Sequence, residues 1–194
     1  MAETLGRTSP LDAFAQRFAE LPDTVRIVEE PFLTMIDLRA DAAAAAALTT
    51  QLGIDLPTVA STYAVAGTVT AIWMGPDEWL VTSTTDAPET FERELREAVS
   101  ELGGTAADVS AQRTTLWLSG AHAREVLAQG CSIDLHPRVF AANSAVQTML
   151  GQANVVLAAG DDTGTTFQIL VRSSFAHYLA AWLLDAATEY IGTP

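Results

Sequence analysis

The stretch from Asp108 to Phe140 constrains the fold most, because a strand, a helix and an exit turn can each be read within it from residue type. Residues 114–118 alternate, with two leucines on one face and Thr115 and Trp117 on the other. Alternation with a period of two is typical of a strand. We therefore expect a strand near the start of this stretch.

A helix is expected to follow that strand. Ser119 directly precedes a run of helix formers, so it is predicted to be the N-cap of a helix over residues 120–129. Gly130 is predicted to close the helix in the left-handed conformation, and His136-Pro137 prevents an early restart because proline disfavours a helical residue before it. The stretch therefore predicts a strand, a capped helix and a turn-rich exit.

Other boundaries can be predicted from capping residues. Asp41 is expected to cap an alanine-rich helix that ends at Gly53. Residues 86–89 have the pattern of a capping box with proline in the first turn, and Gly103 follows that helix. Ser173 or its neighbour is expected to cap a last helix that continues to residue 190.

The remaining elements follow from hydrophobic periodicity. A short helix over residues 11–21 has one apolar face, and residues 54–66 are expected to be an irregular connection. The expected strands are 25–29, 32–39, 68–74, 79–84, 145–150, 153–159 and 165–171. Hairpins that alternate with single helices predict an α+β fold, with antiparallel sheets and helices packed on one face. We expect residues 1–194 to form one compact unit, and Gly103-Gly104 marks a possible boundary between two lobes, 1–103 and 104–194.

Composition excludes several functions. The 194 residues include 24 aspartates and glutamates, ten arginines and no lysine, and the net charge is -14. The negative electrostatic field of such a chain, with no basic cluster to offset it, argues against nucleic-acid binding. The absence of lysine excludes enzymes that form a Schiff base on lysine and phosphate sites of the Walker type. Apolar runs are too short to span a membrane, and the first residues do not form a secretory signal. We therefore expect a cytoplasmic protein that contacts neither nucleic acid nor membrane.

Two candidate pairs have a catalytic and a structural interpretation. Cys131 is the single cysteine, with His136 five residues later as a possible base, but a lone cysteine after a glycine is more often a buried apolar residue. Asp77 and Glu78 are adjacent acids near two tryptophans, and burial could separate their pKa values for acid–base work. Adjacent turn residues such as these usually stay in water, which favours a structural role for the two acids. The structural interpretation is therefore preferred for Cys131 and for the acidic pair.

Two further candidates concern metal binding. Asp161, Asp162 and Thr163 could suggest a calcium loop, but the alternating ligands and distal glutamate of such a loop are missing, which favours a hairpin turn. His177 falls beside the apolar stripe of the last helix, where a surface histidine is more common than a ligand. We assign no catalytic, cofactor-binding or metal-binding residue from the sequence.

Several ordered motifs together resemble the gamma subunit of heterotetrameric sarcosine oxidase. The match extends over roughly the last two thirds of the chain, with Ser9-Pro10-Leu11 added near the start. The matching motifs are Gly75-Pro76-Asp77-Glu78-Trp79, Asp108-Val109-Ser110, residues 118–131 (LSGAHAREVLAQGC), Asp134-Leu135-His136-Pro137 and residues 147–151 (QTMLG).

This resemblance implies a fold and a role. Such subunits are similar to a shortened, folate-binding aminomethyltransferase fold with two ferredoxin-like lobes. They belong to assemblies with alpha, beta and delta subunits that oxidise sarcosine to glycine with oxygen and pass a one-carbon unit to tetrahydrofolate. The resemblance places FAD, FMN, NAD and folate on the larger subunits and zinc on delta. It implies a non-catalytic structural subunit with no cofactor of its own.

Each of the two possible roles predicts its own contact residues. In a structural subunit, Trp79, Trp117 and the helix over residues 11–21 would pack against larger partners. In the alternative, a stand-alone folate-binding protein related to aminomethyltransferases, Arg113, Arg124 or Arg172 would receive the glutamate tail.

Overall fold

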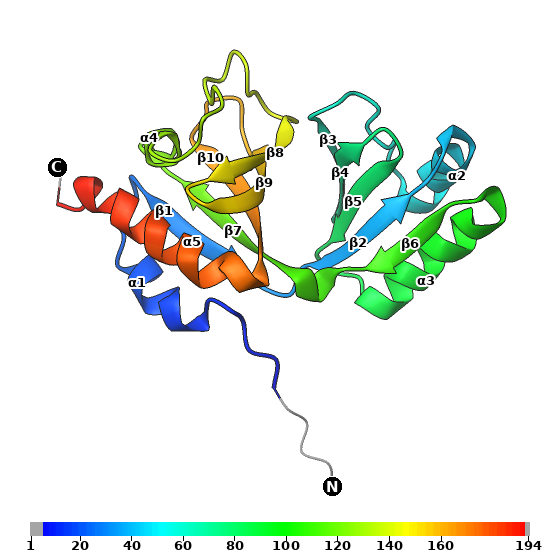
Figure 1. The fold of residues 1–194 in the computed structure, drawn as a ribbon, viewed down its shortest axis with the longest axis horizontal. Helices are drawn as coiled ribbons and strands as arrows, with labels where there is room; N and C mark the ends of the chain where they lie inside the picture. Colours follow the sequence, from blue (N-terminus) through cyan, green and yellow to red (C-terminus); the bar gives the residue numbers. More distant parts are fainter. Residues whose placement is uncertain (1–5, 193–194) are drawn as a thin grey trace, which may run out of the picture.

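The computed structural model describes residues 6–192 and forms two five-stranded antiparallel sheets with helices outside them (Figure 1). Sheet A has the strand order β1-β7-β10-β9-β8, and sheet B has the order β3-β4-β5-β2-β6. Sheet A consists of β1 (Arg26–Glu30), β7 (Arg113–Ser119), β10 (Thr166–Arg172), β9 (Ala153–Ala159) and β8 (Ala145–Leu150). Sheet B consists of β3 (Tyr63–Ala66), β4 (Val69–Gly75), β5 (Glu78–Ser83), β2 (Thr34–Arg39) and β6 (Thr105–Asp108).

The helices cover the outer face of each sheet, so the expected α+β fold with antiparallel sheets is confirmed (Figure 1). Helices α1 (Ala15–Ala19), α4 (Ala123–Ala128) and α5 (Ser173–Ala186) pack on sheet A, and α2 (Ala42–Leu52) and α3 (Pro88–Val99) pack on sheet B. Short 3-10 turns are η1 (Asp12–Phe14), η2 (Ser100–Leu102), η3 (Ser110–Gln112) and η4 (Ala187–Tyr190).

A third core joins the inner faces of the two sheets. Alternation along β2 sends Ile36 and Leu38 to the outer core of sheet B, while Met35 points to the inner core. The inner core contains Leu33, Met35, Ile72, Leu80, Ala145, Val156, Ala158 and Leu170. The fold therefore has four layers, helix, sheet, sheet and helix, and its apolar residues are distributed over three clusters.

The chain crosses twice between the sheets. Strand β1 pairs with β7 in sheet A although β2, only three residues later, pairs with β5 and β6 in sheet B. Strand β6 belongs to sheet B although it follows Gly103-Gly104. The sheets therefore do not divide at residue 103, because each half of the chain gives one strand to the other sheet.

Backbone strain is concentrated at these junctions. The non-glycine residues with positive φ in the described chain are Phe32, Ser61 and Asn143, at 62°, 63° and 66°. Phe32 lies in the β1–β2 crossing, and the other two flank the bridge between Thr62 and Ser144 that links the sheets. A bulky side chain rarely adopts this conformation, so surrounding contacts must hold Phe32 there.

Local capping signals were partly correct. The Asp41 carboxylate accepts the N–H groups of Ala43 and Ala44 at 2.9 Å, and Gly53 ends α2 with φ of 64°, as expected. Helix α3 also forms as predicted, but Asp86 does not cap it. Its carboxylate instead accepts the Ser83 hydroxyl at 2.6 Å, and the N-cap position is Ala87.

Three boundary predictions are wrong. Ser119 is the last residue of β7 rather than an N-cap, and α4 begins only at Ala123. Ser173 does not cap α5 either, since its hydroxyl donates to the carbonyl of Ala111. Residues 63–66, expected to be irregular, form β3.

Gly130 has a different role from the predicted one. It is not left-handed, and a Cβ at this position would lie 2.4 Å from Cζ2 of Trp182. The glycine therefore lets α5 approach the end of α4 closely, which capping rules do not detect.

Most of the apolar residues expected to face partners pack inside the chain. Leu11 is fully buried and Phe18 is 5% exposed, both in the outer core of sheet A. Trp79 is 3% exposed and its indole N–H donates to the carbonyl of Pro57 at 2.8 Å. Trp117 is half-buried and donates to a carboxylate oxygen of Glu30 at 2.9 Å. Leu11, Phe18 and Trp79 therefore belong to the cores, whereas Trp117 lies outside the core clusters and keeps part of its surface exposed.

Candidate functional site

The polar side chains at the junction of the sheets form a small cleft. They come from the inner face of sheet B, from η3 and from the facing ends of β7 and β10. The cavity has a volume of about 180 Å³. It is lined by Asp37, Met74, Glu78, Leu80, Val109, Gln112, Arg113 and Arg172.

Two arginines lie opposite each other at this cleft. Arg113 begins β7 and Arg172 ends β10, and the antiparallel register pairs the two residues directly. Like charges placed opposite each other in a sheet repel. Burial and the nearby charge of Arg172 lower the pKa of Arg113, although Asp37 and Glu78 favour its charged form. Neither arginine forms an ion pair with a carboxylate in residues 6–192.

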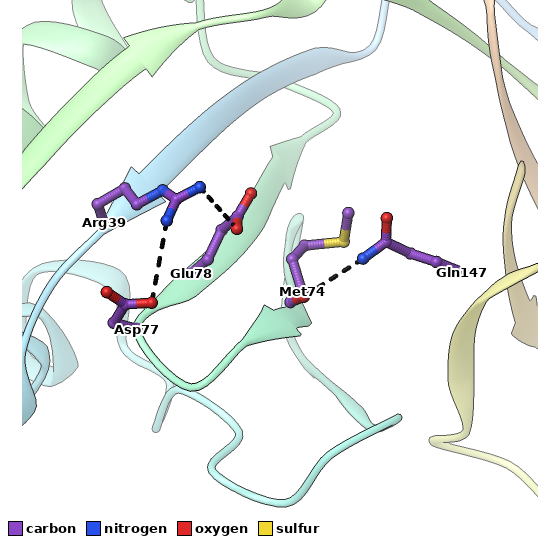
Figure 2. Close-up of polar contacts among 5 residues, drawn as sticks. All are labelled: Arg39, Met74, Asp77, Glu78 and Gln147. Atoms are coloured by element: carbon purple, nitrogen blue, oxygen red, sulfur yellow. Dashed lines mark hydrogen bonds and ion pairs between the residues drawn. The ribbon is translucent and has the colours of Figure 1, made fainter. Parts of the chain in front are cut away.

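The acidic pair of the β4–β5 turn is engaged by a third arginine. Arg39, on β2, contacts Glu78 at 2.8 Å and Asp77 at 3.9 Å (Figure 2). Asp77 is largely exposed, and both acids lie at the tight turn that residues 75–78 form. This arrangement gives the two carboxylates a structural task, holding β2 against the hairpin.

Hydrogen bonds between the sheets fix the walls of the cleft. The Gln147 side-chain amide, on β8, donates to the carbonyl of Met74 at 3.3 Å (Figure 2). Away from the cleft, the Tyr63 hydroxyl donates to the carbonyl of Ala159 at 2.6 Å, and burial raises the pKa of this tyrosine. Both bonds link the two sheets, so separating the sheets would break them.

The Asp161 loop is a hairpin turn whose carboxylate is saturated by protein donors. Its Oδ1 accepts the N–H groups of Thr163, Gly164 and Thr165 at 2.9, 2.7 and 3.1 Å, and its Oδ2 accepts the Thr165 hydroxyl at 2.8 Å. Partial burial acts to raise the pKa of Asp161, but the hydrogen bonds from Thr165 and neighbouring threonines hold it well below its usual range. The lone pairs that calcium would need are occupied by these donors.

Asp161→Asn is expected to destabilise the chain by about 1 kcal/mol at neutral pH, because an amide is a weaker acceptor than a carboxylate. The pKa of the group is lowered on folding, so its contribution is complete above the unfolded pKa of about 3.9 and is lost as pH falls through the folded pKa. Urea unfolding at several pH values should show that the free energy of unfolding falls less steeply at acidic pH for the variant than for the wild-type chain. Asp162→Asn is the matched control, since Asp162 accepts only the N–H of Ala142 in the described chain. Equal losses at both positions would contradict this account.

The remaining candidates do not meet at one place. Cys131 is 8% exposed in the outer core of sheet A, whereas His136 is exposed and its Nδ1 accepts the N–H of Arg138. His177 is exposed on α5 and stacks edge-on against Phe14. Within residues 6–192, no three His, Cys, Asp or Glu side chains are grouped to hold a metal ion, and no helix is long and apolar enough to cross a bilayer.

The structure brings together two of the three arginines predicted to bind the glutamate tail of folate in the alternative function. Arg113 and Arg172 meet at the cleft, but Arg124 lies on α4, outside sheet A and beside Gly164. Asp37 was not recognised from the sequence as a cleft residue. The sequence feature that could have identified Asp37 is its position two residues after Met35, because a charged side chain on the same strand face as a buried residue indicates a polar site.

Comparisons with known proteins decide the family. The model of the family described as sarcosine oxidase, gamma subunit family, matches residues 37–189. The sarcosine oxidase subunit gamma of Corynebacterium sp. (strain P-1) is 36% identical over 97% of this chain and 93% of its own length. The chain belongs to the sarcosine oxidase gamma subunit family. The resemblance read from the ordered motifs is thereby confirmed.

Solved structures agree with this family and extend the fold relationship. The heterotetrameric sarcosine oxidase from Corynebacterium sp. U-96, in complex with pyrrole 2-carboxylate, contains a chain with a TM-score of 0.87 and 31% identity, over 97% of this chain and 98% of that one. The glycine cleavage system aminomethyltransferase T from Bartonella henselae has a TM-score of 0.62 at 14% identity, over 88% of this chain and 48% of that one. The gamma subunit family therefore shares its fold with about half of an aminomethyltransferase, as the sequence resemblance implied.

Proposed function

We propose that this chain is a structural subunit of a heterotetrameric sarcosine oxidase and contributes no catalytic residue to it. Its partners are alpha, beta and delta subunits, and the complex oxidises sarcosine to glycine with oxygen and passes the one-carbon unit to tetrahydrofolate. One observation carries the proposal, the near-complete structural match to a chain of a heterotetrameric sarcosine oxidase. A cytoplasmic location fits the single, buried, free cysteine.

The side chains available suit a structural role better than cofactor binding. The inter-sheet cavity of about 180 Å³ is smaller than the roughly 300–1,000 Å³ typical of small-molecule sites. Larger hollows of about 560 and 760 Å³ are grooves on the surface. With no lysine in the sequence, arginine is the only fully charged side chain that could hold the phosphate groups of a flavin or NAD. We propose, as the family resemblance implies, that the partner subunits hold FAD, FMN, NAD and tetrahydrofolate and that delta holds zinc.

The purified chain alone is expected to be colourless and to consume no oxygen with sarcosine. The physical reason is that the two hollows of sufficient volume described within residues 6–192 are open grooves, which would leave a redox group exposed to water. Absorbance in the flavin region and an oxygen electrode check this, with the assembled complex as positive control. Tight binding of tetrahydrofolate by the isolated chain, measured by calorimetry, would instead support the stand-alone folate-binding alternative.

A further inference from the structure

Two surface hollows lie on either side of Arg113. The larger, about 560 Å³, is lined by Arg113, Arg172, Met149 and Phe175 among others. The smaller, about 260 Å³, shares Arg113 and is also lined by Arg7 and Phe32. The larger hollow shares Arg113 and Arg172 with the cleft that Asp37 and Glu78 also line, and the smaller one shares Arg113 with it. Together they extend over the crossing points of the chain, from the β1–β2 crossing to the start of α5.

The charge of these hollows is opposite to that of the chain. The sequence has 24 acids against ten arginines, yet the residues lining the two hollows include three arginines and no aspartate or glutamate. Within residues 6–192, none of these three guanidinium groups forms an ion pair. Arg7 stacks on the ring of Phe32 at 4.4 Å, and the Arg113 guanidinium donates to the side-chain oxygen of Gln112 at 2.6 Å. Asp37 and Glu78 of the cleft lie near Arg113 and favour its charged form, but neither forms an ion pair with it. Guanidinium groups without an ion pair remain able to receive a carboxylate from elsewhere.

Large apolar side chains are exposed beside these charges. Phe32, Phe175 and Met149 are 41%, 42% and 42% exposed. Phe32 is held in a strained backbone conformation while its ring stays accessible, and strain of this kind is common where proteins bind ligands or partners. Phenylalanine, methionine and arginine are the residue types enriched in protein interfaces. The combination is typical of protein docking, since a small molecule would be enclosed more fully.

We propose that this face docks a segment of a larger oxidase subunit that presents carboxylates next to apolar side chains. The inference rests on the proposed function and adds to it the location and chemistry of one interface. The docking face is defined by Arg7, Phe32, Arg113, Met149, Arg172 and Phe175. A partner carboxylate lies between Arg113 and Arg172 and relieves their mutual repulsion, while the two phenylalanines pack on apolar groups of the segment. The acidic remainder of the chain repels such a segment, so charge directs it to this face.

The test uses the assembled complex, co-expressed with its flavin-containing subunits and diluted in mass photometry. Arg113→Gln with Arg172→Gln is expected to raise the dissociation constant about 100-fold, because two charge-assisted contacts are lost. The wild-type complex should also weaken with added salt, and the variant should be less sensitive. The dissociation constant of the Arg172→Lys variant should lie between those of the wild-type chain and the double variant, because lysine keeps the charge but not the bidentate geometry.

The matched control is Arg93→Gln with Arg138→Gln, which removes the same charge from exposed positions outside both hollows. Thermal unfolding establishes that each variant is folded. If the double variant does not fold, Arg172→Gln alone replaces it in the test, because Arg172 is exposed. Equal dissociation of the double variant and its control overturns the docking face but leaves the subunit function intact. Failure of the wild-type chain to associate overturns both. A third outcome would also overturn the proposal. If the wild-type chain binds free glutarate and the double variant does not, while both associate equally with the other subunits, the face is a small-molecule site.

Discussion

Gly120→Ala is expected to destabilise the chain by about 4 kcal/mol, combining backbone strain with a steric clash. Gly120 has a φ of 121°, a region that side chains rarely adopt. A Cβ there would lie 2.4 Å from the carbonyl oxygen of Thr24 and 2.6 Å from that of Asp23. Both neighbours are backbone atoms, so no rotamer change can make room.

The clash also affects the connections of α4. Gly120 donates its N–H to the Thr165 carbonyl at 2.9 Å, and His122 donates to the Thr24 carbonyl at 3.0 Å. Moving residues 23–24 away would weaken the second bond. Urea unfolding of the purified chain measures the loss as a lower midpoint.

Gly67→Ala is the matched control. Gly67 also has a positive φ, 58°, but nothing lies within 4 Å of the added Cβ. Only the conformational cost remains, about 1 kcal/mol. Equal losses at positions 67 and 120 would show that the close approach to Thr24 does not exist.

Phe167→Ala is expected to cost about 4 kcal/mol, the loss typical of a large side chain removed from a packed core. Phe167 is on β10, has no exposed surface and stacks with Phe140 at 6.4 Å between ring centroids. The outer core of sheet A around it also includes the N-terminal Leu11 and residues of α4 and α5. The cavity would therefore loosen three segments that are distant in sequence.

Phe175→Ala provides the comparison for the isolated chain. Its ring is 42% exposed, so its removal should change the free energy of unfolding by well under half as much. Denaturation of the two variants under the same conditions checks the difference. Similar losses would mean that the assignment of Phe167 to the core, or of Phe175 to the surface, is incorrect.

Local signals in the sequence predicted much of the fold. Asp41 and Gly53 bracket α2 as their chemistry requires, and the amphipathic pattern after Pro88 forms α3. Ser119 and Gly130 misled because their roles depend on partners far away in sequence. The same holds for β1 and β6, since the choice of sheet is decided by pairing with distant strands and not by the strands' own residues.

The functional surface was less accessible to sequence reasoning. Arg113 and Arg172 could be named as anion-binding candidates, but their direct opposition depends on the register of β7 with β10. Phe32 was expected to be an ordinary strand residue, and only the crossing between the sheets gives it a positive φ and an exposed ring. Trp79 was expected at a partner surface, yet a tryptophan with a buried hydrogen-bond acceptor nearby is equally suited to the core.

The central claim is that this chain works as a stoichiometric, non-catalytic part of a larger oxidase. Native mass spectrometry of the chain co-expressed with alpha, beta and delta subunits tests it most directly. We expect one assembly that contains one copy of each chain and whose flavin stays with the other subunits when this chain is released. A chain that never joins the assembly, or that leaves it carrying flavin or folate, would contradict the account.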